Sequence, residues 1–261
     1  MTIHIYGSCA GTEPIKGWRH LSFSIDRLGK QYFFDAGESC GYTAYTNGIN
    51  IAQTRRIIIS HTHMDHVGGL ANLLWYIRKL DTQCGLKACP QIDIHIPNLE
   101  TWEGIKMILK NTEGNFKCDF KIFAHEVSDG ELFYDTEDDM KVTAYHNTHL
   151  PQEESGKWRS FSYLIESEGK KVFFTGDYGR ISDFSNILNC NNIDLLMIET
   201  GHHTAENTAS ALKEAGIFPK FLGFIHNGPD VRRSPDETVK KAEDILGVKT
   251  AVFTDGMTFE F

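Results

Sequence analysis

The chain has 261 residues, of which 41% are hydrophobic and 23% are charged, a composition typical of a globular protein with a substantial core. Its net charge of −9 argues against broad binding to nucleic acid, because such binding needs a positive field. No apolar run is long enough to span a membrane, and the first residues enter a strand pattern, so neither a membrane anchor nor a signal peptide is expected. The six cysteines are scattered without a Cys-x-x-Cys pair, which predicts reduced thiols and a cytoplasmic location.

A hairpin pattern occurs twice in the chain, over residues 22–37 and again over residues 160–177. Each copy has a strand, a glycine turn and an aromatic second strand. Each is followed by an apolar strand that ends in polar residues, first at His61 and then at Glu199. Two similar units predict a pseudo-symmetric fold with an internal pseudo-twofold repeat, in which both halves send strand ends to one rim.

Strands and helices alternate along the rest of the chain. Strands are predicted over residues 3–6, 56–59, 92–97, 116–127, 131–134, 140–145, 195–198, 221–225 and 250–253, and helices over 67–80, 99–110, 205–215 and 235–246. No low-complexity tract or linker interrupts this α/β pattern, so residues 1–261 are predicted to form a single domain.

The densest group of chemically active side chains is His61, His63, Asp65 and His66, at the end of an apolar strand. Imidazole binds zinc and other first-row ions, and a carboxylate adds a harder ligand. Residues two apart in an extended segment point the same way, so His61 and His63 can hold one ion. Asp65 and His66, where the chain turns into a helix, can face a second ion.

A site for two ions needs further ligands at other strand ends. Asp177 ends the second hairpin, and His226 follows an apolar strand. The third candidate is His146 or His149. Alternation puts His146 on the apolar face of its strand, where it can pack, whereas His149 lies beyond the strand's end, so His149 is the predicted ligand.

The pattern His-x-His-x-Asp-His after an apolar strand resembles the first metal motif of the metallo-β-lactamase superfamily of two-metal hydrolases. The segment before His149 also resembles the third motif of that family. This resemblance implies a four-layer αββα sandwich with the site at the edge where both sheets end. The ligands that it implies are His61, His63 and His149 for one ion, Asp65, His66 and His226 for the other, and Asp177 between them.

Within the superfamily, the start of the chain resembles the branch of ribonuclease Z and the cyclic phosphodiesterases, through a glycine-rich loop, Arg19 and residues 35–37. Met64 departs from this branch, where glycine is usual, and residues 67–148 lack a long basic arm. The predicted activity is therefore hydrolysis of a small phosphodiester by a metal-bridging hydroxide in a dinuclear site. Zinc is the expected ion, with manganese and iron as alternatives. The expected partner is a small molecule rather than a nucleic acid or a membrane, and a homodimer is left open.

The leaving group also needs a proton. His202 and His203 follow the strand-end Glu199, and His203 before Thr204 resembles the His-x-Thr element of ribonuclease Z. His203 is therefore predicted to be the general acid, oriented by Glu199, and it is assigned as catalytic together with Asp65. Capping or packing at the turn is the competing interpretation. A lactone or thioester hydrolase, or a metal-binding or redox protein without hydrolytic activity, are the alternative functions.

Overall fold

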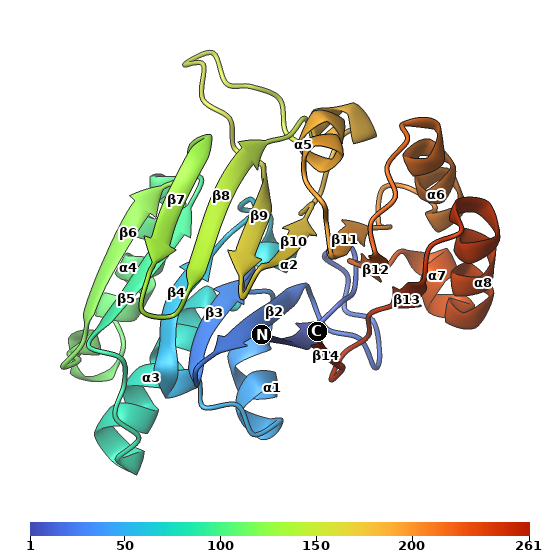
Figure 1. The fold of residues 1–261 in the computed structure, drawn as a ribbon. Coiled ribbons are helices and arrows are strands. Elements are labelled where there is room, and N and C mark those ends of the chain that lie inside the picture. Colours follow the sequence, from blue (N-terminus) through green and yellow to red (C-terminus); the bar gives the residue numbers. More distant parts are fainter. The chain divides into compact units, whose positions relative to one another are not determined.

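The computed structural model describes residues 1–261 and contains two seven-stranded mixed sheets (Figure 1). The chain divides into two compact units: unit 1 comprises residues 1–7, 12–127 and 255–261, and unit 2 comprises residues 8–11 and 128–254. Each unit is built on one of the two sheets and has its own hydrophobic core. The single domain expected from the sequence stays a prediction.

Unit 1 contains a sheet with the strand order β14-β1-β2-β3-β4-β5-β6, in which β3 to β6 are parallel. Its elements are β1 (Thr2–Gly7), β2 (Ser22–Arg27), β3 (Lys30–Phe34), α1 (Cys40–Thr46), η1 (Ile51–Gln53), β4 (Thr54–Ile58), α2 (Met64–Val67), α3 (Leu70–Cys84), β5 (Gln91–Ile96), α4 (Leu99–Lys110), η2 (Glu113–Phe116), β6 (Lys121–Glu126) and β14 (Thr258–Glu260). Alternate residues of β5, such as Ile92 and Ile94, enter a core with Leu73 and Ile77 of α3. This packing fixes the register of the parallel strands and therefore the position of their ends.

Unit 2 contains a sheet with the strand order β13-β12-β11-β10-β9-β8-β7, in which β10 to β13 are parallel. Its elements are β7 (Gly130–Asp135), β8 (Met140–His146), β9 (Phe161–Ser167), β10 (Lys170–Phe174), η3 (Ile181–Asp183), α5 (Ser185–Cys190), β11 (Leu195–Glu199), α6 (Ala205–Glu214), β12 (Phe221–Ile225), α7 (Pro229–Arg233), α8 (Pro235–Leu246) and β13 (Thr250–Val252). Residues from α5, α6 and α8 pack on the strands in one core, which includes Phe173, Leu196 and Phe224.

The predicted internal repeat is confirmed in the two hairpins. The turn of the first has φ 53° at Leu28 and 79° at Gly29, and the turn of the second has φ 53° at Glu168 and 68° at Gly169. Two left-handed residues in a two-residue turn match the right-handed twist of the flanking strands. In both units the second hairpin strand then pairs in parallel with the next strand, β3 with β4 and β10 with β11.

Several boundaries differ from the sequence-based expectation. Helix α3 continues to Cys84 and ends at the left-handed Gly85, whose φ is 68°. Strand β6 begins only at Lys121, because a 3-10 turn with left-handed residues occupies residues 113–116. The short elements α1, α5, α7 and β14 carry weak sequence signals and were not expected. None of the helices combines the length and the apolar character needed to cross a bilayer.

Candidate metal centre

The first group of predicted ligands lies in unit 1, between the end of β4 and the first turn of α2. The ring centroid of His61 lies 4.5 Å from that of His63 and 4.0 Å from that of His66. The Nε2 atom of His66 lies 3.6 Å from an oxygen of Asp65. His61, Asp65 and His66 are buried, whereas His63 is exposed. The structure therefore gathers all four predicted ligands of this motif into one group.

Asp35, at the end of β3, supports this group from beneath. Its carboxylate accepts hydrogen bonds from the Ser60 backbone N–H at 2.7 Å and from the Ser60 hydroxyl at 2.8 Å, and it lies 2.8 Å from Nδ1 of His66. The residue is fully buried and has a left-handed φ of 53°. A left-handed non-glycine residue costs about 1–3 kcal/mol, so the surrounding hydrogen bonds are needed to hold it.

These contacts assign the tautomers of two histidines. Nδ1 of His66 donates to the Asp35 carboxylate, and Nδ1 of His61 lies 3.2 Å from the Ser60 hydroxyl oxygen. In each ring the proton on Nδ1 leaves the lone pair on Nε2, so Nε2 is the atom that could bind a metal ion. A histidine that binds a metal usually donates its other N–H to a carboxylate or a similar acceptor. The donor chemistry of unit 1 therefore fits a divalent ion.

Two glycines allow the ligand loop to approach β3. A Cβ on Gly69 would lie 2.2 Å from the carbonyl oxygen of Gly37, and a Cβ on Gly37 would lie 2.5 Å from the carbonyl oxygen of Asp65. The backbone of Ala36 donates to His66 O at 2.6 Å and accepts from Gly69 N at 2.7 Å. The predicted Asp-Ala-Gly turn thus supports the metal motif by close backbone packing.

The second group lies in unit 2, at the carboxyl ends of the parallel strands β10, β11 and β12. Asp177, Glu199, His202 and His226 each offer a ligand atom, and these atoms lie within 4.8 Å of one another. Nδ1 of His226 is 3.1 Å from Asp177 and 3.6 Å from Glu199. Neighbouring parallel strands end at the same edge of a sheet, which explains why residues far apart in sequence meet here.

His226 has a left-handed φ of 50°, the second non-glycine residue with this conformation among the predicted ligands and their supports. Its neighbour Asn227 is anchored on both sides, through its N–H to Ser8 O at 2.6 Å and through its side chain to Phe253 O at 2.7 Å. A Cβ on Gly201 would lie 2.9 Å from Nδ1 of His226, so the glycine leaves room for the ring.

Glu199 was expected only to orient a histidine, yet it is central to this group. Its buried carboxylate accepts from the backbone N–H groups of Gly201 at 2.8 Å and His202 at 2.9 Å. Burial raises the pKa of the Glu199 carboxyl, but hydrogen bonds with His202 and His226 outweigh burial, and the pKa lies well below its usual range. The hydrogen bond to Glu199 in turn raises the pKa of His202.

The contacts of His146 and His149 differ, although the His146 side chain is 41% exposed and does not pack on the apolar face expected from alternation. His146 is the last residue of β8, where Nδ1 lies 2.6 Å from Asp129 and the ring stacks on Trp158 with centroids 4.4 Å apart. His149 lies beyond the strand, with Nε2 3.7 Å from Asp177. Its backbone N–H donates to the side chain of a buried asparagine, Asn147, at 3.1 Å. These contacts support His149 as a ligand, which stays a prediction.

The two histidines after β11 have separate partners. Nδ1 of His202 is 3.0 Å from Glu199, whereas Nε2 of His203 donates to the carbonyl oxygen of Tyr178 at 3.1 Å. The His203 ring also stacks on Tyr178, with centroids 4.4 Å apart. The expected contact between Glu199 and His203 is therefore replaced by one between Glu199 and His202.

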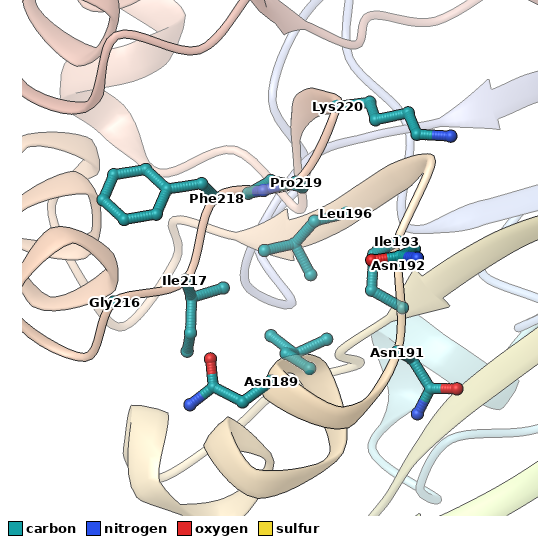
Figure 2. Close-up of a pocket in the computed structure, with 11 residues that line it drawn as sticks. Asn189, Asn191, Asn192, Ile193, Leu196, Gly216, Ile217, Phe218, Pro219 and Lys220 are labelled. Atoms are coloured by element: carbon teal, nitrogen blue, oxygen red, sulfur yellow. The ribbon is translucent and has the colours of Figure 1, made fainter.

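A separate cavity of about 260 Å³ lies elsewhere in unit 2, around the beginnings of β11 and β12 (Figure 2). Asn189 and Asn191 line it, together with Ile217 and Lys220. The cavity lies at the amino ends of β11 and β12, whereas Glu199 and His226 lie at the carboxyl ends of these two strands. None of the predicted ligands lines it.

Comparisons with known proteins identify the family of the chain. The family described as "Beta-lactamase superfamily domain" matches residues 33–254. Ribonuclease Z of Cyanothece sp. (strain PCC 7425) is 29% identical over 153 residues, which are 56% of this chain and 43% of that protein. Ribonuclease Z of Saccharolobus islandicus (strain M.14.25) is 24% identical over 265 residues, covering 87% of this chain and 88% of that protein. The chain thus spans less than half the length of the former relative.

Two solved structures show the same fold. The metallo-β-lactamase fold protein YhfI from Bacillus subtilis has a TM-score of 0.74 at 16% identity, covering 100% of this chain and 99% of that chain. Human tRNase Z, short form, has a TM-score of 0.73 at 19% identity, with coverage of 100% and 99%. The fold class expected from the sequence is confirmed by these likenesses.

Proposed function

The chain belongs to the β-lactamase superfamily, and we propose that it is a metal-dependent hydrolase of a small phosphodiester. The observation that carries this proposal is the pair of histidine and carboxylate groups at strand ends, one in each unit. Each group combines nitrogen and oxygen donors with supporting residues that orient them, as a divalent ion requires. The kinship with ribonuclease Z supports phosphodiester chemistry.

We propose that the two groups hold two divalent ions jointly. Their ligands would be His61, His63, Asp65, His66, His149, Asp177 and His226. Such ions, zinc or else manganese or iron, would activate a water for attack and polarise the phosphoryl oxygen. Within unit 1, Asp35 would keep His66 in the tautomer that can bind. Asp65, the second residue of α2, is proposed to take part in catalysis from the ligand loop.

A small substrate is favoured over a large RNA for two reasons. The net charge of −9 works against a polyanion, whose binding depends on neutralising many phosphates. Residues 67–148 form strands of the two sheets and the helices between them, from α3 to β8. No basic arm extends from this segment. Comparison of hydrolysis of bis(p-nitrophenyl) phosphate with cleavage of a 3′-extended transfer RNA would decide between the two classes.

The contacts of the two histidines after β11 favour one of them as the proton donor for the leaving group. His203, expected from the sequence, is engaged by the carbonyl of Tyr178, whereas His202 is held by Glu199 and its side chain is 46% exposed. We therefore propose His202 as the donor and keep His203 as the competing candidate. General acid catalysis contributes about 10²–10⁴-fold, and less when the leaving group is acidic.

Two substrates separate these roles. His202→Ala should cripple turnover of an alkyl phosphodiester and hurt a nitrophenyl diester far less, because nitrophenolate needs little protonation. His203→Ala should change neither strongly. An equal loss on both substrates for His202→Ala would show that His202 positions the substrate. A loss confined to the alkyl phosphodiester in His203→Ala would show that His203 is the proton donor.

The proposed function as a whole is tested with a panel of chromogenic phosphodiesters, esters, lactones and thioesters, assayed with zinc and with manganese. The expected result is a phosphodiesterase rate well above the others. A lactonase or thioesterase rate above it would establish the runner-up hydrolase. Tightly bound redox-active iron without any hydrolytic rate would instead identify a redox protein with this fold.

A further inference from the structure

An apolar groove in unit 1 lies apart from both ligand groups. It has a volume of about 480 Å³ and is bounded by α4, η2 and the start of β6; we call it the α4–β6 groove. Its apolar lining comprises Trp102, Met107, Leu109, Phe116, Phe120 and Ile122. The volume is within the range of about 300–1,000 Å³ that is usual for small-molecule sites, and apolar walls with few polar groups are their usual lining.

The floor of the groove belongs to the core of unit 1. Trp102, Leu109 and Phe120 are each more than 90% buried and pack in the same cluster as the strands and α3. The bottom of the groove between α4 and β6 is therefore formed by well-packed core side chains. The exposed Met107, at 61%, stands on the wall of the groove.

One wall of the groove is η2, a turn with left-handed residues that is followed by a hydrogen bond from α3. In η2, φ is 69° at Gly114, 51° at Asn115 and 53° at Phe116. A left-handed bulky residue such as Phe116 is rare and persists only where the surroundings fix it. Arg78 of α3 does so, because its Nε donates to Lys117 O at 2.6 Å. The turn thereby places the Phe116 ring in the wall of the groove and 6.2 Å from the Trp75 ring.

Three charged side chains from α4 also line the groove. Lys106 forms an ion pair with Glu103 at 2.6 Å, and these two charges offset each other. Lys110, one turn further along the helix, forms no ion pair. The groove thus combines apolar walls with one lining lysine, Lys110, that has no ion-pair partner.

We propose that the α4–β6 groove binds a fatty acid, with the acyl chain along the apolar walls and the carboxylate against Lys110. A head group with one negative charge matches the single lysine without an ion-pair partner. A head group with several negative charges would be repelled by the net charge of −9 on the chain. Each CH₂ that enters the groove contributes about 0.8 kcal/mol, which corresponds to roughly a fourfold gain in affinity. This site is independent of the proposed hydrolysis.

The first test titrates the full-length protein by calorimetry with hexanoate, octanoate, decanoate and dodecanoate, each below its micellar concentration. Affinity should rise about fourfold per CH₂ until the groove is filled and then level off. Decanol should bind more weakly than decanoate. Lys110→Met, which keeps an apolar stem, should remove that difference. Affinity without dependence on chain length, or a carboxylate preference unchanged in Lys110→Met, would overturn the proposal.

A matched pair of variants on α4 separates the groove from the rest of the helix surface. Met107 and Ile108 are adjacent and similarly exposed, at 61% and 60%, but only Met107 lines the groove. Met107→Glu should abolish decanoate binding, whereas Ile108→Glu should leave it unchanged. Equal effects of the two variants would show nonspecific adsorption and refute the site. A different outcome would refute the fatty-acid site in favour of a dimer interface. In that case the unaltered chain forms a dimer and does not bind decanoate, and Met107→Glu abolishes the dimer, which would show that a second copy covers the groove.

Cys118 provides a reporter within the groove. It is partly buried and lines the cavity, whereas Cys84 and Cys190 are exposed elsewhere. Bound decanoate should slow alkylation of Cys118 in site-resolved mass spectrometry and leave Cys84 and Cys190 unaffected. Protection of all three thiols, or of none, would contradict binding in the groove.

Discussion

Asp35→Asn tests whether the carboxylate beneath the first ligand group orients a metal ligand. The substitution keeps the size of the side chain but replaces one oxygen by an NH₂ group. Asp35 accepts from three donors, at distances of 2.7–2.8 Å, two of them from Ser60 and one from His66. An amide has only one acceptor oxygen, so an NH₂ group must face at least one N–H or O–H donor.

Two quantities should fall, each by a similar free energy. Hydrogen bonds to charged groups contribute about 1.5–3 kcal/mol each. The free energy of unfolding of Asp35→Asn, measured without metal in the presence of a chelator, should therefore fall by roughly that amount. Loss of an outer residue that orients a metal ligand typically lowers metal affinity by about 10–100-fold, or about 1.4–2.7 kcal/mol. In Asp35→Asn the His66 N–H would lose its charged acceptor, and at most a neutral amide oxygen would hold the proton on Nδ1.

The assay is competition for zinc with a chelator, combined with thermal unfolding of the chelated protein. Asp26→Asn is the matched control, because this carboxylate also accepts hydrogen bonds, from Gly29 N–H at 3.0 Å and from the Gln31 amide, but at the turn of the hairpin. The control should bind zinc as the unaltered chain does. If Asp35→Asn loses stability but retains full zinc affinity, the carboxylate supports the fold only, and the reasoning about tautomers is wrong.

Three further predictions concern single residues. His149→Ala should lose metal and activity, whereas His146→Ala should mainly lower the unfolding temperature. If metal analysis shows the loss in His146→Ala instead, His146 is the ligand and His149 is not. Gly69→Ala should strongly destabilise the protein in denaturant unfolding, because its Cβ would lie 2.2 Å from a carbonyl oxygen, and unchanged stability would show that the loop can move. Burial raises the pKa of Asp93, but hydrogen bonds from His125 and Gln91 and the Arg56 charge hold it below its usual value. Asp93→Asn should therefore be less stable than the unaltered chain at pH 7, and the gap should close as the pH falls below about 4; a gap independent of pH would exclude this electrostatic origin.

The first ligand group could be predicted from sequence because it is local. Four ligand-type residues within one strand end and one turn need no knowledge of the rest of the fold. The helix start at Ala205 was equally local, since Thr204 caps it by accepting from Asn207 N–H at 3.2 Å. The two hairpins were visible because their aromatic strands and glycine turns repeat.

The supporting contacts were not predictable from local pattern. Asp35 reaches Ser60 only because β3 and β4 pair in parallel with Phe34 opposite Ile58, and no local signal gives that register. The pairing of Glu199 with His202 arises from a tight turn that folds two backbone N–H groups onto the carboxylate. A choice between adjacent histidines depends on that turn, which the sequence does not encode in any simple periodicity.

The late start of β6 has a similar cause. The apolar residues from 116 onward continue the strand pattern, but Phe116 ends a left-handed turn and the ladder of β6 with β5 begins only at Lys121. The turn is followed by a contact with a residue far away in sequence, since Arg78 donates a hydrogen bond to the carbonyl oxygen of Lys117. Long-range contacts of this kind override local propensity.

The central claim is that both ligand groups hold metal together, and metal stoichiometry tests it most directly. The chain should be purified without chelator, reconstituted with zinc and measured by elemental analysis beside bis(p-nitrophenyl) phosphate hydrolysis. The account predicts two ions per chain, and a loss of both metal and activity when His61 of the first group or His226 of the second is replaced by alanine. A stoichiometry that stays at or below one, or activity that survives complete removal of metal, would contradict it.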